Sequence, residues 1–366
     1  MRIEHHAPGY VKCISPYVPG KPVAELAREM GLDEARIIKL ASNENPLGPS
    51  PLARQAVTAS LRELARYPDG NGFALKQALV RKFGLSADQL VLGNGSNELL
   101  DIFTRAFVPA GSSGVYSQHA FAVYPLALQA VGARGIEVPA RFFSHDLAAT
   151  GDALAADTRI IYIANPNNPT GTFLPGALIE AFLRLVPEHV LVVLDEAYSE
   201  YLQPELRYDS FAWVRRFPNL VVTRTFSKIY GLGGLRVGYA VADPAVAGLA
   251  NRMREPFNVN SLALAAAEAA LDDVAFVERS YATNRAGMAQ LVAGFNALNL
   301  EYIPSAGNFI TVRVGDAVAV NQALLRQGVI VRPVANYGLP DWLRVTVGLE
   351  TENKRFLAAL AAALKG

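Results

Sequence analysis

The 366-residue chain has one cysteine, Cys13, so it cannot form an internal disulfide or a cysteine-rich metal site. It also lacks an excess of charge of one sign, because 34 basic residues stand against 33 acidic ones and no polybasic run occurs. This balance argues against nucleic acid and anionic membrane surfaces as partners. The most apolar segments, around 261–270 and 356–364, are interrupted by charge or too short to span a bilayer.

The first residues, Met1 to His6, lack the apolar core of a signal peptide. Together with the single cysteine, this favours a soluble protein in the reducing cytoplasm. His5 and His6 are adjacent, but no carboxylate or cysteine is spaced to complete a metal site around them. We therefore expect a tail at this end, and no bound metal.

Hydrophobic residues make up 51% of the chain, and its length favours two domains over one. Residues 1–22 are rich in proline and glycine, which predicts an extended arm. From residue 51 onward, helical patterns alternate with continuous apolar runs, as in a mainly parallel sheet covered by helices on both faces. A long alanine-rich helical region over 261–298 and a mixed α+β segment follow Pro256.

The predicted fold is therefore α/β, with a large domain built on a mainly parallel central sheet and a smaller α+β domain. We assign 1–35 to the arm and part of the small domain, 36–255 to the large domain and 256–366 to the small domain. These boundaries follow the change of pattern at Pro256.

The stretch from Thr223 to Tyr239 has one lysine after a polar turn, followed by three glycines and an arginine. The apolar run before it predicts a buried strand, so Lys228 would project from the carboxyl end of a sheet, where α/β folds bind ligands. A desolvated lysine can form a Schiff base with a carbonyl, and Ser227 and Arg236 suit a phosphate group. Together these features suggest pyridoxal phosphate. The alternative is a surface lysine and arginine in a glycine-rich loop.

Three other predicted strands also end in polar turns. Ser96 and Asn97 begin a helix after one strand and could bind an anion through their N-H groups, or could simply cap that helix. Asn168 lies in a turn with two prolines, which would hold its amide toward the same crevice. Asp195 could pair with a pyridine nitrogen, or cap a helix, and Tyr198 could bond the ring's phenolic oxygen. For Glu196 we expect a solvated charge.

In this order, Asn165-Pro-Asn-Asn-Pro-Thr-Gly171, Asp195-Glu-Ala-Tyr198 and Ser227-Lys228 with Arg236 resemble the fold type I pyridoxal-phosphate-dependent aminotransferases. The stretches from Leu40 to Gly48 and from Leu343 to Gly348 further resemble the histidinol-phosphate aminotransferase branch. The resemblance runs from about residue 7 to the carboxyl end. It implies transamination between histidinol phosphate and 2-oxoglutarate.

The resemblance also implies roles for individual residues. Lys228 would hold pyridoxal 5'-phosphate and move the proton, and Arg344 would grip a carboxylate, with Arg332 and Tyr17 on the rest of the substrate. Tyr67 would reach the phosphate of a neighbouring subunit, so a homodimer with shared sites is implied. The ring would contact Asn168, Asp195 and Tyr198, and the phosphate would contact Ser96, Asn97, Ser227 and Arg236.

The chain departs from the family pattern at two positions. Phe121 stands where many members have a tyrosine stacked on the pyridine ring, and Asn97 replaces a common acidic residue. Side-chain specificity therefore stays open between histidinol phosphate, aromatic amino acids and decarboxylation of an amino-acid phosphate. A pyridoxal-phosphate-sensing regulator would need a basic DNA-binding domain, for which the first 22 residues leave no room.

Overall fold

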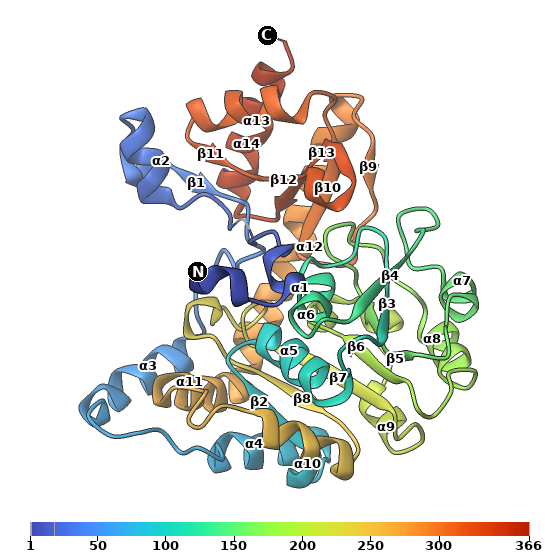
Figure 1. Cartoon of the computed structure of the whole chain (residues 1–366). Coiled ribbons are helices and arrows are strands. Elements are labelled where there is room, and N and C mark those ends of the chain that lie inside the picture. Colours follow the sequence, from blue (N-terminus) through green and yellow to red (C-terminus); the bar gives the residue numbers. More distant parts are fainter. Residues whose placement is uncertain (1, 18, 366) are drawn as a thin grey trace.

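The computed structural model describes residues 2–17 and 19–365, which form two bodies stacked one above the other (Figure 1). The larger body contains a seven-stranded sheet, and the smaller one carries the carboxyl end of the chain. The described part of the amino-terminal arm lies between the two bodies. The predicted fold class, a fold type I α/β architecture with a second α+β domain, is confirmed.

The large sheet has the strand order β2-β8-β7-β6-β5-β3-β4. Only β8 runs antiparallel to its neighbours; the other pairs are parallel, as the continuous apolar runs predicted. The strands are β2 (Leu90–Gly93), β3 (Ser113–Ser117), β4 (Arg134–Val138), β5 (Thr158–Ala164), β6 (Leu191–Asp195), β7 (Leu220–Thr225) and β8 (Gly238–Val241).

Alternate side chains of the central strands enter two separate hydrophobic cores, one on each face of the sheet. In β6, Val192 and Leu194 face one core, and Leu191 and Val193 face the other. The first core is covered by α3 (Pro51–Ser60), α4 (Phe73–Phe83), α8 (Gly176–Leu183), α9 (Ser210–Val214) and α11 (Ser261–Asp272). The second is covered by α5 (Ser96–Phe107), α6 (Val123–Ala130) and α10 (Pro244–Met253). A short helix, α7 (Leu147–Asp152), packs beside α8.

The small body is built on an antiparallel sheet of order β12-β13-β10-β9, with a two-stranded parallel pair, β1 and β11, beside it. Leu291, Phe295 and Phe356 are fully buried at the centre of its core. Its strands are β1 (Ile38–Lys39), β9 (Tyr302–Ile303), β10 (Phe309–Arg313), β11 (Val329–Ile330), β12 (Arg332–Val334) and β13 (Leu339–Thr346). Its helices are α2 (Val23–Met30), α12 (Val274–Ala297), α13 (Ala317–Arg326) and α14 (Glu350–Ala363).

The packing does not follow the domain boundaries predicted at residues 36 and 256. Helix α11 belongs to the large body, because Ala263, Ala266, Ala267 and Ala270 are buried in its core against α3 and α4. Strand β1 pairs with β11 and so belongs to the small body. The predicted helical region over 261–298 is also two helices, which meet where the Asp273 side chain accepts the N-H of Phe276 and caps α12.

The prediction of an extended arm over residues 1–22 is wrong for part of its length. A 3-10 turn forms at Ile3–His6, and Gly9–Lys12 form a short helix, α1, that packs against α6. His5 and His6 are exposed, and no group of three metal-ligating side chains lies close together within residues 2–17 and 19–365. No helix of this part of the chain is both long and apolar enough to cross a bilayer.

The close approach of α11 to α3 predicts a specific sensitivity to side-chain size. Ala267→Leu should lower the free energy of unfolding by about 1–3 kcal/mol, because the added atoms have no space in this core. Ala265→Leu, on the half-buried side of the same helix, should change it by less than about 0.5 kcal/mol. Urea unfolding of the two variants measures the difference, and equal effects would contradict the packing of α11.

Candidate active site

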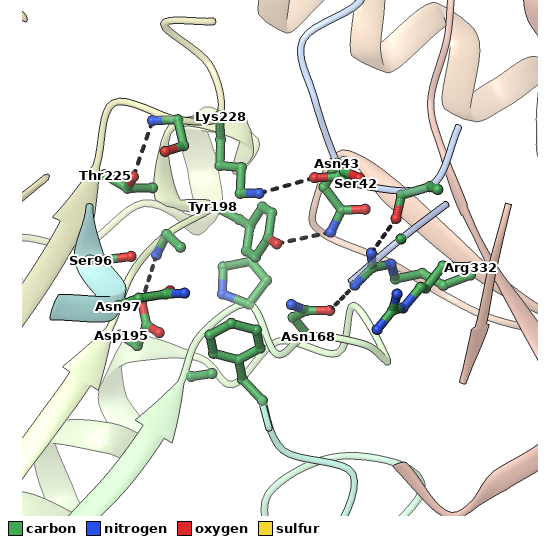
Figure 2. Close-up of a pocket in the computed structure, with 18 of the residues that line it drawn as sticks. Ser42, Asn43, Ser96, Asn97, Asn168, Asp195, Tyr198, Thr225, Lys228 and Arg332 are labelled. Atoms are coloured by element: carbon green, nitrogen blue, oxygen red, sulfur yellow. Dashed lines mark hydrogen bonds between the residues drawn. The ribbon is translucent and has the colours of Figure 1, made fainter. Parts of the chain in front are cut away.

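A cavity of about 210 Å³ lies where the carboxyl ends of β5, β6 and β7 meet the amino end of α5 and the small body. Figure 2 shows side chains from all these segments pointing into it. Twelve of the thirteen predicted site residues line the cavity: Tyr17, Ser96, Asn97, Phe121, Asn168, Asp195, Tyr198, Ser227, Lys228, Arg236, Arg332 and Arg344. The thirteenth, Tyr67, lies outside it.

Lys228 is the amine at the centre of the cavity. It follows β7 by three residues, and its Nζ donates a hydrogen bond to the carbonyl oxygen of Ser42, 3.3 Å away. Burial lowers the pKa of Lys228 to about 8, and the cations of Arg344 and Arg236 add to this effect. A considerable fraction of the amine is therefore neutral near physiological pH, which is the form that attacks a carbonyl.

An anion-binding cup lies on one side of Lys228. Helix α5 begins at Ser96 directly after Gly95, which has no side chain to cap it, so the helix presents backbone N-H groups to the cavity. Gly95 has φ +80°, a conformation that side chains rarely adopt, and a Cβ there would lie 2.3 Å from the Arg236 guanidinium and displace it. Arg236 also donates to Ser227 Oγ over 3.2 Å. These donors match a phosphate monoester.

Asp195 supplies a buried carboxylate at the end of β6. Its Oδ2 accepts a hydrogen bond from Tyr124 Oη over 2.9 Å, and its Oδ1 accepts from the Ala197 N-H and from Thr223 Oγ1. Burial raises the pKa of Asp195, and these hydrogen bonds oppose that rise. A protonated ring nitrogen is the kind of partner that such a carboxylate requires.

Asn168 and Tyr198 face the cavity as hydrogen-bond donors. The Oδ1 of Asn168 accepts from Arg344 over 2.5 Å, which leaves the amide N-H₂ to donate elsewhere. Tyr198 Oη accepts from Asn43 Nδ2 over 2.9 Å, so its own proton remains available to a ligand. Burial raises the pKa of Tyr198 to about 12, so this hydroxyl stays protonated at neutral pH.

Two arginines from the small body line the opposite side. Arg332 on β12 and Arg344 on β13 are paired across the sheet, and both are largely buried. Arg344 donates to the Ala41 carbonyl over 2.6 Å, but its Nε has no partner among the described residues. The Arg332 guanidinium lies 5.6 Å from the centre of the Tyr17 ring. These side chains can bind anionic groups of a substrate.

Two residues that touch the predicted site were not singled out from the sequence. Tyr124 orients Asp195 and lies three positions after Phe121, whose ring it meets edge-on. Asn43 orients Tyr198 and has a left-handed backbone, φ 56°. Their partners lie 71 and 155 positions away, a separation at which local pattern carries no signal.

One predicted environment differs from the structure, and the role predicted for Tyr67 in a neighbouring subunit stays a prediction. Glu196 was expected to be a solvated charge, which is wrong, because it is 1% exposed and forms an ion pair with Arg224. Tyr67 is 84% exposed and stacks on Phe257, with 4.9 Å between the ring centres. It does not reach the cavity of its own chain.

Residues 35–360 match the family model for aminotransferase class I and II, so the chain belongs to that family of transferases. The chain is 59% identical to histidinol-phosphate aminotransferase 2 of Nitrosospira multiformis, over 100% of this chain and 93% of the relative. It is 62% identical to histidinol-phosphate aminotransferase 2 of Ralstonia nicotianae, over 98% and 96%. Within the larger family, the chain belongs to the histidinol-phosphate aminotransferases.

A solved histidinol-phosphate aminotransferase from Sinorhizobium meliloti, in complex with pyridoxal-5'-phosphate, has the same fold. It aligns with a TM-score of 0.90 and 28% identity, over 98% of this chain and 97% of that one. The cofactor of the present chain is accordingly pyridoxal 5'-phosphate. The cavity fits it, because the glycine-lined cup, the buried carboxylate and the low-pKa amine correspond to its phosphate, ring nitrogen and aldehyde.

The lowered pKa of Lys228 predicts how the cofactor-free chain reacts with pyridoxal 5'-phosphate. The rate should rise with pH and reach half its maximum near pH 8, because only the neutral amine attacks. Arg344→Gln should move this midpoint upward, since it removes a cation that disfavours protonation of Lys228. Stopped-flow absorbance measures both.

Arg313→Gln serves as the control, because Arg313 is an exposed cation of the same small sheet and pairs with Glu301. It should leave the midpoint unchanged. A wild-type midpoint near the ordinary lysine value of 10.5 would show that Lys228 is not desolvated.

Proposed function

We propose that the chain transfers the amino group of histidinol phosphate to 2-oxoglutarate, giving imidazole-acetol phosphate and glutamate in histidine biosynthesis. The observation that carries this proposal is the pair of arginines, Arg332 and Arg344, on the side of the cavity away from the phosphate cup. Histidinol phosphate bears a phosphate and glutamate bears two carboxylates. The two arginines can bind these different anions in turn.

Each cavity residue has a defined task in this reaction. Bound pyridoxal 5'-phosphate acts as the electron sink for the substrate's α-carbon. Asp195 would keep the ring nitrogen charged, and Tyr198 and Asn168 would donate hydrogen bonds to the phenolic oxygen. Lys228 Nζ holds the cofactor between turnovers and moves the proton at the α-carbon, for which a pKa of about 8 is suitable. Phe121 packs on the ring.

The substrate assignment predicts that the two arginines affect different substrates. Arg344→Ala should lower kcat/KM for both histidinol phosphate and glutamate by about 10- to 100-fold, the value of one charged hydrogen bond. Arg332→Ala should mainly lower kcat/KM for the substrate that places a second anion beside it. Phenylalanine, with one carboxylate and an uncharged ring, should be nearly indifferent to Arg332→Ala. Steady-state kinetics with all three donors measures this.

Two outcomes would redirect the proposal. If phenylalanine is the best donor and Arg332→Ala changes none of them, the chain is an aromatic amino acid aminotransferase. If it releases carbon dioxide from an amino-acid phosphate faster than it forms glutamate, it is a decarboxylase on the same scaffold. Arg313→Ala, on the exposed side of β10, is the control for loss of a positive charge.

We also propose that the active unit is a homodimer in which Tyr67 completes the phosphate site of the other subunit. Tyr67 and Phe257 form a stacked aromatic pair on the surface, and Leu64 and Phe73 nearby in the chain are also exposed. Exposed apolar groups of this kind favour an interface between proteins. Small-molecule substrates are the other proposed partners, and the cytoplasm is the proposed location, in keeping with the free, exposed Cys13.

Mixing two inactive variants tests the shared site. Lys228→Ala removes the reactive amine, and Tyr67→Phe removes only the hydroxyl while keeping the stack on Phe257. A mixed dimer has one site with both lesions and one with neither, so a 1:1 mixture after subunit exchange should regain about one quarter of wild-type activity. Activity no greater than the average of the separate variants, or a monomer by light scattering, would reject the proposal.

A further inference from the structure

A buried ion pair lies behind the cofactor cavity, between Glu196 and Arg224. Glu196 directly follows Asp195, and Arg224 lies on β7 four residues before Lys228. The Nε and Nη2 of Arg224 both donate to Glu196 Oε2, over 3.0 and 2.8 Å. Ser210 Oγ donates to the same oxygen over 2.9 Å. This one carboxylate oxygen therefore holds β6, β7 and the start of α9 together.

The surroundings of the pair are mainly aromatic, and a further carboxylate, that of Glu200, also lies near Arg224. The Arg224 guanidinium lies 4.2 Å from the centre of the Phe211 ring and 5.7 Å from that of Phe83. The two charged side chains are 13% and 1% exposed. Burying two charges costs so much desolvation that apolar residues of similar volume often give equal or greater stability. Stability alone is therefore a poor explanation for an ion pair here.

The pair is also connected to the third strand that delivers a cofactor group. Tyr208 Oη accepts a hydrogen bond from Asn165 Nδ2 over 2.9 Å, and the nearby Glu196 carboxylate adds to burial in raising the pKa of Tyr208. Asn165 follows β5 and begins the turn that carries Asn168, and its Oδ1 accepts the N-H of Leu174 over 2.7 Å. Two bonded polar pairs, Asn165 with Tyr208 and Glu196 with Arg224, thus lie near each other behind the ends of β5, β6 and β7.

Glu196 is linked to a carboxylate in the cavity through β7. The Glu196 N-H donates to the Thr223 carbonyl over 2.9 Å, and the hydroxyl of Thr223 donates to Asp195. Asp195 is the residue before Glu196, so a displacement of the backbone at Glu196 also displaces Asp195. Displacements well below 1 Å in such groups are enough to impair catalysis.

We infer that Glu196 and Arg224 are positioning residues: their ion pair holds the ends of β5, β6 and β7 in the register that places Asn168, Asp195 and Lys228 around the cofactor. This inference rests on the proposed function, because it assigns the three side chains to one cofactor. The pair touches neither cofactor nor substrate. It acts on the reaction only through the positions of these three residues.

Glu196→Gln tests the inference, because it keeps the shape of the side chain and removes the charge. Glu180→Gln is the matched control, since Glu180 on α8 also accepts from two arginines, Arg184 and Arg216, over 2.7 and 2.6 Å. Glu196→Gln should weaken binding of pyridoxal 5'-phosphate to the cofactor-free chain by about 10- to 100-fold, as happens when groups that orient metal ligands are lost. It should lower kcat more than it raises KM, whereas Glu180→Gln should change neither.

A double variant separates positioning from stability. Glu196→Leu with Arg224→Met replaces the pair by apolar side chains, so the melting temperature should return to the wild-type value or exceed it. Cofactor affinity, measured by tryptophan fluorescence, and kcat should stay low. A double variant that recovers both would overturn the inference, as would a Glu196→Gln chain with a lower melting temperature but wild-type affinity and kcat.

Should Glu196→Gln fail to fold, Ser210→Ala provides a milder change, because it removes one donor to Glu196 and no charge. Ser210→Ala should also weaken cofactor binding. If both Ser210→Ala and the double variant bind the cofactor with wild-type affinity, the inference is rejected. The affinity readout needs no substrate. If the wild-type chain binds the cofactor but does not use histidinol phosphate, the proposed reaction is refuted. The positioning role is then still tested by the cofactor affinities of the variants.

Discussion

The active site depends on the parallel pairing of β5, β6 and β7. Parallel strands in register end at the same edge of a sheet, and here Ala164 pairs with Asp195, which in turn pairs with Thr223. The polar turns that follow therefore meet at one place, although they lie far apart in the chain. Asp195 is the last residue of β6, and Asn168 and Lys228 come from the turns after β5 and β7. The apolar strands thus position the reactive groups while remaining buried themselves.

The chemistry of the site follows from several positively charged side chains that lie together in one buried cavity. Arg236, Arg332 and Arg344 line the same cavity as Lys228, and burial together with the nearby cations lowers the pKa of the lysine to about 8. Anions relieve this arrangement, and we propose that the cofactor phosphate and the substrate supply them. The same electrostatic field that binds the ligands also prepares the nucleophile.

The small body contributes as much to the site as the large sheet does. Arg332 and Arg344 come from its antiparallel sheet, and Asn43 lies in the segment that joins it to the large body. Asn43 hydrogen-bonds both Tyr198 of the large body and Thr346 of the small one. The cavity therefore exists only when the two bodies are held together. Asn43 thus connects Tyr198, which faces the cavity, with β13, the strand that carries Arg344 (Figure 2).

The sequence by itself determined the fold class and most of the cavity. Apolar runs ending in polar turns identified Asn168, Asp195 and Lys228, because the carboxyl end of a parallel strand is where such folds bind ligands. The resemblance to a family added Tyr17, Arg332 and Arg344, which no local pattern would have brought together. It also implied that Tyr67 acts in a neighbouring subunit.

Only the tertiary structure decided which partners these residues have. The sequence pattern predicted a solvated charge at Glu196. The prediction was wrong because its partner, Arg224, lies on another strand, and the helix that covers both comes from elsewhere in the chain. Tyr124 and Asn43 were missed for the same reason, and α11 joined the large body through alanines whose partners are on α3. Periodicity reports which face of an element is apolar, but not what packs against it. That information arises from contacts between residues distant in the chain.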